Sequence, residues 1–209
     1  MLNELPDNFN CIEFLSNFGV LMPQYNGEIE WHVRTHDSIE YSKCSLGKME
    51  VSPHTEYYEG KENPPKYLAL WCVNPASCGG GTFSLCDSYP FLDNLTDKEN
   101  EIIQNESYLF QSEQGLMKLG VGSSAQHKIL SLSSSKERIF RFNTTGMNDG
   151  NRLFLDSFRD RFLEFYQDTC ISFLQEKFSL LIWNNYRMVH SRSSKFSDKT
   201  RHLVRFWIN

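Results

Sequence analysis

The chain has 209 residues, 40% of them hydrophobic, and a formal net charge of −5 at pH 7. This length suits one hydrophobic core, so we expect a single domain over residues 1–209. The acidic balance provides no positive field for a phosphate backbone and argues against nucleic acid as a partner. The first ten residues lack the features of a signal peptide, and no apolar run is long enough for a membrane span. The sequence therefore predicts a cytoplasmic protein that does not bind membranes, with its six cysteines reduced.

Strand patterns dominate near both ends of the chain. Apolar and polar residues alternate between residues 27 and 56, and the apolar runs 66–74, 178–183 and 199–208 have the length of strands. Aromatic residues are abundant, with 16 Phe and 9 Tyr, which is typical of a β-rich core. The sequence therefore predicts a mainly β fold that begins and ends in strands.

Helices are expected between these strands. Thr96 and Glu99 form a capping-box pattern that opens a helix over residues 97–110, because the two side chains can satisfy the free amides of the first turn. A second helix is predicted over residues 151–176, where phenylalanines recur at helical spacing and indicate a core-facing stripe. We therefore expect a helical insert at about residues 96–176.

The motif that carries chemistry is His54-Thr55-Glu56. Residues two positions apart leave the same face of a strand, so the imidazole of His54 and the carboxylate of Glu56 converge. With a second histidine, such a pair forms the 2-His-1-carboxylate triad, which leaves coordination positions open on iron(II). His190, in a strand-turn-strand segment, is the expected third ligand. The pair alone is weak evidence, because a histidine and an acid are often two residues apart by chance.

Residues downstream strengthen this interpretation. Thr82 follows three glycines that begin at Gly79, and Arg201 and Arg205 follow His190 in the last predicted strand. An arginine on a strand can pair bidentately with the distal carboxylate of a keto acid, and a threonine hydroxyl can share that carboxylate. Arg141, in the predicted strand IFRFN, is expected to form a salt bridge instead.

Four segments carry a family resemblance: SPHTE, PPKYLALWCVNPASCGGGTF, NNYRMVHSR and DKTRHLVR. In this order and spacing they resemble the superfamily of 2-oxoglutarate-dependent oxygenases that contains taurine dioxygenase and clavaminate synthase. The resemblance covers residues 51–209, and residues 1–48 match it loosely. It implies a double-stranded β-helix, the jelly-roll or cupin-like core, with inserted helices.

The resemblance also implies a set of site residues. It makes His54, Glu56 and His190 the ligands of one Fe(II). It makes Thr82 and Arg201 the partners of the distal carboxylate of 2-oxoglutarate, with O₂ as the second cosubstrate. No further catalytic side chain is expected, because the metal carries the chemistry.

The substrate side is less constrained. Arg205 falls where relatives hold an acidic group of the substrate. Glu50 lies four positions before His54, and on a regular strand it would share the face of that ligand and receive an ammonium group. A bulge near Pro53 would instead turn Glu50 outward. One of the two tyrosines after Glu56 is expected to line the pocket, with Tyr57 as the chosen candidate.

The expected function is the oxidation of a small polar, amino-acid-like metabolite by hydroxylation, desaturation or cyclisation, in natural-product biosynthesis. A glutamate in place of the commoner aspartate ligand resembles the clavaminate synthase branch, which acts on free or carrier-bound amino acids. The substrate is thus a small molecule, either free or tethered to a carrier protein. The alternatives are a sulfonate or aryloxyalkanoate catabolic dioxygenase of the taurine dioxygenase type and a non-catalytic metal-binding jelly roll. Oxygen consumption that depends on 2-oxoglutarate separates the enzymes from the binding protein.

Overall fold

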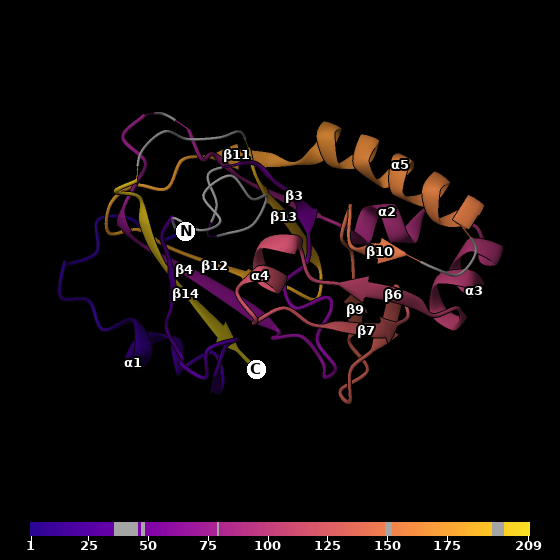
Figure 1. Ribbon diagram of the computed structural model, residues 1–209, viewed down its shortest axis with the longest axis horizontal. Helices are drawn as coiled ribbons and strands as arrows, with labels where there is room; N and C mark the ends of the chain where they lie inside the picture. The colour runs from indigo at the N-terminus through magenta and orange to yellow at the C-terminus, as the bar shows by residue number, and fades with distance from the viewer. Residues whose placement is uncertain (36–45, 47–48, 79, 149–151, 194–198) are drawn as a thin grey trace.

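A computed structural model describes most of the chain (Figure 1). The described residues are 1–35, 46, 49–78, 80–148, 152–193 and 199–209. Two antiparallel sheets form the centre of the molecule, and helices and shorter strands surround them. The predicted mainly β fold with inserted helices is confirmed.

The first sheet has five strands. Their spatial order is β1 (Leu21–Met22), β14 (His202–Ile208), β4 (Tyr67–Asn74) and β12 (Leu180–Asn184), and β2 (Trp31–Val33) also pairs with β14. The longest strands, β4 and β14, pair with each other at the centre of this sheet. Three of the apolar runs predicted as strands therefore form its core.

The second sheet has four strands and carries most of the candidate metal ligands. Their order is β11 (Ile171–Phe173), β5 (Phe83–Asp87), β13 (Met188–Arg192) and β3 (Val51–His54). Every neighbouring pair is antiparallel. Because β3 and β13 are adjacent, the two segments that contain the predicted histidine ligands lie side by side although the sequence separates them widely.

The two sheets pack face to face. Leu68 and Leu70 on β4 share a hydrophobic cluster with Phe83 and Leu85 on β5. Alternate residues of β4 and β14 point the other way and pack against α1 (Cys11–Leu15), as the period-two geometry of a strand requires. The inner faces of the two sheets therefore enclose the core in which the site lies.

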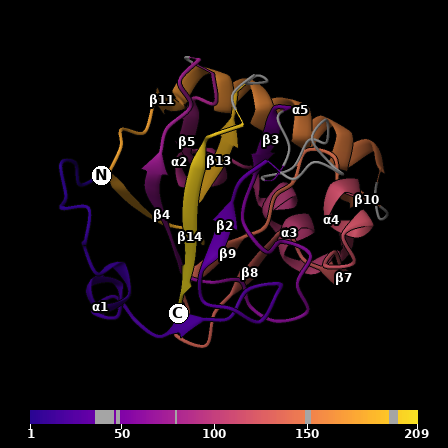
Figure 2. The ribbon, with the colours of Figure 1, turned by 60° about the vertical axis from the view of Figure 1, so that its left-hand side comes forward.

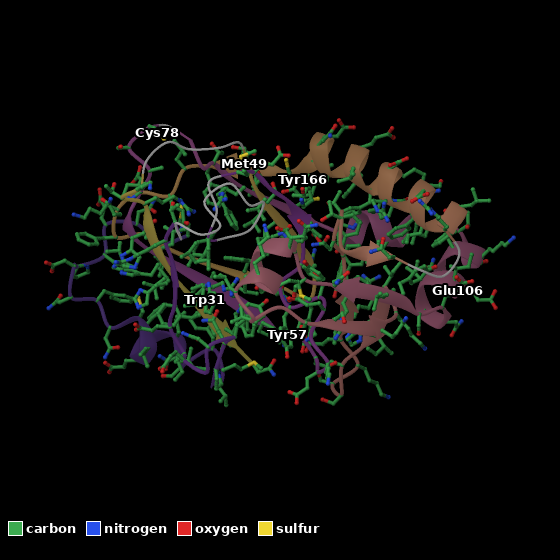
Figure 3. All side chains as sticks on the ribbon, in the orientation of Figure 1. Trp31, Met49, Tyr57, Cys78, Glu106 and Tyr166 are labelled. Atoms are coloured by element: carbon green, nitrogen blue, oxygen red, sulfur yellow. The ribbon has the colours of Figure 1, made fainter. Side chains whose placement is uncertain are left out.

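Helix α5 (Arg152–Thr169) covers the outer face of the second sheet, on the opposite side of the molecule from α1 (Figure 2). Its apolar stripe includes Phe158 and Phe162, both fully buried, so the predicted core role of the phenylalanines is confirmed. Tyr166 points from α5 onto the sheet, where its hydroxyl donates to Ser191 Oγ at 2.8 Å (Figure 3). This bond ties the helix to β13.

The first predicted helix is shorter than expected. It begins at the predicted capping box but ends as α3 (Asp97–Asn105), and β6 (Tyr108–Gln111) follows. Tyr108 and Phe110 are fully buried, whereas the residues between and after them are less buried. That alternation has the period of a strand, and it overrides the helical propensity of the preceding residues.

The helical description of residues 96–176 is wrong in part. The helix predicted over residues 151–176 ends at Thr169, and β11 then adds an edge strand to the second sheet. The insert also contains several short paired strands. The predicted strand IFRFN overlaps the strand Arg138–Phe140, and the others alternate over too few residues to be identified from sequence. The remaining elements of this region are α2 (Tyr89–Asp93), α4 (Gln114–Lys118), β7 (Ser124–His127), β8 (Leu130–Leu132), β9 (Arg138–Phe140) and β10 (Met147–Asn148).

Within the described ranges, no helix combines the length and apolar character of a transmembrane span. The described cysteines are all free thiols, and Cys78 among them is exposed (Figure 3). Cys44 and Gly79 lie outside the described residues.

Candidate functional site

The predicted ligands come together at one point between the sheets. His54 is the last residue of β3 and pairs across the strands with His190 on β13, and their ring centroids are 4.2 Å apart. His190 Nε2 lies 3.9 Å from Glu56 Oε2. One ligand atom from each of the three residues lies within 4.8 Å of the others. In the described part of the chain, no other group of three such residues comes this close.

Hydrogen bonds fix the first histidine and the carboxylate before any metal binds. His54 Nδ1 lies 2.8 Å from the Ser52 carbonyl, so Nδ1 carries the proton and Nε2 is left to bind a metal. The backbone N–H of Glu56 donates to Asn185 Oδ1 at 2.8 Å, and Asn185 Nδ2 donates back to the Glu56 carbonyl at 3.1 Å. Asn185 is fully buried, so it sets the backbone position of Glu56 rigidly.

Burial keeps both imidazoles in the form that binds metals. It lowers the pKa of His54, and it lowers the pKa of His190 well below the ordinary value. His190 packs between the rings of Phe83 and Trp183, at centroid distances of 5.6 Å and 5.2 Å. Two neutral imidazoles and a carboxylate form the ligand set of non-haem iron(II) sites with open positions.

One carboxylate oxygen of Glu56, Oε1, already pairs with protein side chains. Arg205 Nη1 lies 2.7 Å from Glu56 Oε1, and the Tyr25 hydroxyl donates to the same oxygen at 3.2 Å. Gln24 holds Arg205 in place, since its Oε1 accepts from Arg205 Nε at 2.9 Å. Oε2 therefore remains to face His190. Sequence analysis placed Arg205 at the substrate alone and missed this pairing.

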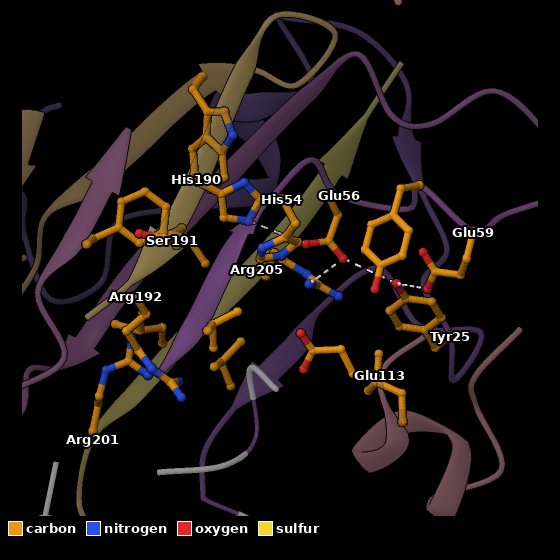
Figure 4. Close-up of a pocket in the computed structure, with 18 residues that line it drawn as sticks. Tyr25, His54, Glu56, Glu59, Glu113, His190, Ser191, Arg192, Arg201 and Arg205 are labelled. Atoms are coloured by element: carbon orange, nitrogen blue, oxygen red, sulfur yellow. Dashed lines mark hydrogen bonds and ion pairs between the residues drawn. The ribbon is translucent and has the colours of Figure 1, made fainter. Parts of the chain in front are cut away.

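The three ligands line a cavity with charges of opposite sign at its two ends (Figure 4). Arg192 and Arg201 lie at one end, and Glu59 and Glu113 lie at the other. The metal ligands and Arg205 stand between these ends. A metal at the triad would thus have a cationic region on one side and an anionic region on the other.

Arg201, directly before β14, lines the cavity as predicted. It is 7% exposed, and burial lowers its pKa to about 10. Thr82 is half-buried just before β5 and is not among the residues that line the cavity, although the resemblance assigned it to the same carboxylate. Arg192, not Thr82, lines the cavity beside Arg201. It could have been identified from strand parity, because it lies two residues after His190.

Glu50 is exposed and does not line the cavity, so its predicted amine-binding role is wrong. The reason is a change of register between β3 and β13. His190 pairs with His54 and Arg192 pairs with Val51, so three steps on β3 match two steps on β13. This bulge contains Pro53 and reverses the face of the residues before it. The outward alternative for Glu50 is the one that the structure adopts.

The tyrosine that lines the cavity is Tyr58, not the predicted Tyr57. Tyr57 has a positive φ of 58°, packs on Trp207 at a centroid distance of 5.0 Å and does not line the cavity. Tyr58 lines it, and its ring lies edge-on to His54 at 6.2 Å. Tyr58 has the same parity as His54 and Glu56, so strand alternation would have selected it in place of Tyr57.

Glu59 is the buried acid that sequence reasoning missed. It is 1% exposed, and its Oε1 accepts hydrogen bonds from Ser112 Oγ at 2.7 Å and from the Tyr25 hydroxyl at 3.2 Å. Its Oε2 has no hydrogen-bond partner among the described residues. Burial raises the pKa of Glu59, and the nearby charge of Glu56 adds to that effect. It lies in a turn after β3, where no periodic pattern marks it.

The family of the chain follows from the match of its sequence. The model of the taurine catabolism dioxygenase TauD, TfdA family matches residues 5–207. The chain belongs to this family. No curated protein matches the chain.

Solved structures agree with this family assignment at the level of the fold. An asparagine oxygenase in complex with Fe(II), 3-hydroxyasparagine and succinate has a TM-score of 0.73 at 16% identity, over 91% of this chain and 59% of that one. A point mutant of the non-haem iron oxygenase OrfP, in complex with (3S)-hydroxy-L-Arg, has a TM-score of 0.72 at 16% identity, over 94% of this chain and 62% of that one. The chain thus spans about three fifths of the length of each of these two oxygenases. The jelly-roll prediction is confirmed.

Proposed function

We propose that this TauD, TfdA family chain is an Fe(II)- and 2-oxoglutarate-dependent dioxygenase that oxidises a small, polar, amino-acid-like molecule. The observation that carries the proposal is the convergence of His54, Glu56 and His190 in a cavity with charged groups on both sides. His54 Nε2, Glu56 Oε2 and His190 would hold the iron. When bound, iron(II) supplies the oxidising power of O₂ to a substrate C–H bond, with conversion of 2-oxoglutarate to succinate and CO₂.

Arg201 is the proposed partner of the distal carboxylate of 2-oxoglutarate. Its guanidinium is buried at the cationic end of the cavity, where a bidentate pair with a carboxylate would offset the cost of burying the charge. Arg192 lies beside it and donates to the Met49 carbonyl at 2.6 Å, which fixes its position. Together the two guanidinium groups orient a dianionic cosubstrate with its keto acid end toward the triad.

The anionic end suits a substrate that carries an ammonium or another cationic group. Glu59 Oε2 is buried without a hydrogen-bond partner, so a substrate donor there would satisfy an otherwise costly group. Glu113 lines the same end. Arg205 also lines the cavity and has an unpaired Nη2, which supports its predicted contact with an acidic group of the substrate. An amino acid presents both charges, and the two oxygenases of similar fold were crystallised with hydroxylated amino acids.

An aryloxyalkanoate catabolic dioxygenase is disfavoured by this charge pattern, because such a substrate has no cationic group to pair with Glu59 and Glu113. A sulfonate such as taurine carries an ammonium group too, so a sulfonate dioxygenase is the alternative that the test must separate. The proposed oxidation is a hydroxylation, desaturation or cyclisation of a free or carrier-tethered substrate, and the proposed location is the cytoplasm.

The test is succinate formation from 2-oxoglutarate under air with added Fe(II), across a panel of free L-amino acids, carrier-bound aminoacyl thioesters, taurine and phenoxyacetate. We expect an amino-acid substrate to raise succinate formation above the substrate-free rate, and we expect phenoxyacetate, which has no cationic group, not to. Turnover of taurine alone would favour the sulfonate alternative. His54→Ala, Glu56→Ala and His190→Ala should each abolish the turnover while far-ultraviolet circular dichroism retains the fold. Full activity in two of these three variants would overturn the metal assignment. Absence of any 2-oxoglutarate-dependent oxygen consumption in the wild type, with free and with carrier-bound substrates, would leave the non-catalytic jelly roll as the function.

A further inference from the structure

A second pocket lies on the surface, away from the metal site. It forms where residues 61–63 meet β7 and the strands of the β8–β9 hairpin, and its volume is about 490 Å³. It shares no lining residue with the cavity of the triad. Its lining is polar, and three of its side chains are the cations Lys61, Lys128 and Arg141. The proposed dioxygenase reaction uses none of them.

Arg141 is an unusual residue because its charge is buried without a carboxylate. It is 3% exposed, Nη1 donates to Ser131 Oγ at 3.2 Å and Nη2 donates to the Glu62 carbonyl at 3.1 Å. Its Nε is buried and has no partner. Among the residues that the structure describes, no acid forms an ion pair with Arg141, so the salt bridge expected from sequence is absent. Burial lowers its pKa to about 10, which reflects the cost of the charged form.

The rest of the pocket adds positive charge. Lys61 and Lys128 are exposed at the rim, and Glu62 contributes the one carboxylate of the lining. His127 Nε2 lies 2.6 Å from the Gly60 carbonyl and therefore carries a proton there. Burial and the charge of Arg141 lower the pKa of His127, so the imidazole is neutral. The pocket thus has a net positive charge in a chain whose formal charge is −5.

We propose that this pocket binds a phosphate-type oxyanion, with Arg141 at its base and Lys61 and Lys128 at its rim. Arg141 uses one N–H of Nη1 for Ser131 and one of Nη2 for Glu62, so each of these nitrogens keeps a second N–H that can donate to a phosphate oxygen. Lysines complement the guanidinium as flexible point charges. Binding would also offset the cost of burying the Arg141 charge. The oxyanion is either free inorganic phosphate or the phosphate monoester of a small molecule, since both present the same oxygens. The proposal does not depend on the dioxygenase function.

Isothermal titration calorimetry of the whole chain with inorganic phosphate, at an ionic strength held constant with sodium chloride, tests the site. We expect one phosphate per chain. The double variant Lys61→Gln/Lys128→Gln should bind about tenfold more weakly, because two charge-assisted contacts are lost. Lys98→Gln, an exposed lysine on α3, is the matched control and should bind as the wild type does. Methyl phosphate in a parallel titration distinguishes the sources, since equal affinity identifies a monoester site.

Two further measurements separate this site from the metal cavity and from a merely structural arginine. Arg141→Lys keeps the positive charge but loses the planar set of guanidinium N–H donors, so it should weaken phosphate binding. If this variant does not fold, the Lys61→Gln/Lys128→Gln variant still tests the proposal. Arg201→Ala should leave phosphate affinity unchanged. The proposal is overturned if the wild type binds no phosphate at millimolar concentration, if the lysine double variant binds as well as the wild type, or if 2-oxoglutarate displaces the bound phosphate.

Discussion

Arg205 Nη1 lies 2.7 Å from Glu56 Oε1, and each of these residues is 5% exposed. The contact joins the first sheet to the second, because Arg205 lies on β14 and Glu56 follows β3. It neutralises the carboxylate in the absence of metal and leaves the other oxygen directed at His190. Arg205 is therefore a positioning residue for the metal ligand as well as a proposed substrate contact.

Arg205→Ala is expected to lower the free energy of unfolding of the metal-free protein by about 3–5 kcal/mol, because it leaves a buried carboxylate unpaired. Fe(II) would neutralise the same carboxylate, so added metal should recover a large part of the loss. Anaerobic urea denaturation with and without Fe(II) measures both values. Arg187→Ala, which removes a partly exposed pair with Asp87, is the control and should cost about 1 kcal/mol or less. Equal losses with and without metal would show that Arg205 does not compensate the ligand charge.

Arg201→Ala is expected to raise the KM for 2-oxoglutarate by the loss of a desolvated charge pair, on the order of 2–5 kcal/mol. Initial rates at varied 2-oxoglutarate and saturating substrate measure the effect. Arg205→Ala, by comparison, should act on the substrate more than on 2-oxoglutarate. If Arg205→Ala weakened 2-oxoglutarate and Arg201→Ala did not, the two roles would have to be exchanged.

Glu59→Gln should raise the KM for an amine-bearing substrate by roughly tenfold or more, because the buried charge that faces the ammonium is lost. The KM for 2-oxoglutarate should change less, since that molecule is held at the other end of the cavity. Glu101→Gln, an exposed acid on α3, is the matched control. An equal rise in both KM values would indicate a general disturbance of the cavity and contradict substrate recognition by Glu59.

A histidine outside the site gives a pH-dependent prediction. Burial, then the charges of Arg34 and His32, lower the pKa of His202 to about 4 from the ordinary value of 6.5. Arg34 Nη2 lies 3.0 Å from His202 Nδ1, so a proton on Nδ1 would displace that donor. Between these two values the unfolded chain binds more protons than the folded chain, and stability must fall as the pH falls.

The variant His202→Gln, which lacks the titrating imidazole, tests this prediction. The free energy of unfolding of the wild type should fall more steeply than that of the variant as the pH falls from about 6.5 to about 4, by the linkage of proton binding to folding. Urea denaturation of both proteins across this range measures the difference, and the carboxylates common to both proteins cancel. Parallel curves would mean that His202 is not held in its neutral form.

The sequence predicted the parts of the site that depend on short-range geometry. His54 and Glu56 could be paired because two residues determine a strand face, and the order of motifs supplied His190 and Arg201. Glu50 does not follow the same rule, because a bulge that contains Pro53 changes the register. Pro53 made this bulge an alternative, but the sequence could not decide whether it forms. Such irregularities depend on the partner strand and are visible only in three dimensions.

The sequence also could not predict contacts between segments that are far apart in the chain, because these contacts depend on how the sheets pack. The pairing of Arg205 with Glu56 needs the two sheets to be stacked, and the hydrogen bonds of Tyr25 to Glu56 and Glu59 join a loop to a turn. Neither the loop that contains Tyr25 nor the turn that contains Glu59 has a periodic pattern that indicates a buried charge. Apart from the strand predicted at IFRFN, the short strands between residues 106 and 148 were missed, because each of them alternates apolar and polar residues over only a few positions.

The most direct test of the whole account is an anaerobic crystal structure with Fe(II) and 2-oxoglutarate, with the iron located by anomalous scattering. The account predicts one iron bonded to His54 Nε2, Glu56 Oε2 and His190, with the distal carboxylate of 2-oxoglutarate paired to Arg201. Iron bound away from these three side chains, or a distal carboxylate beyond ion-pair distance of Arg201, would contradict it.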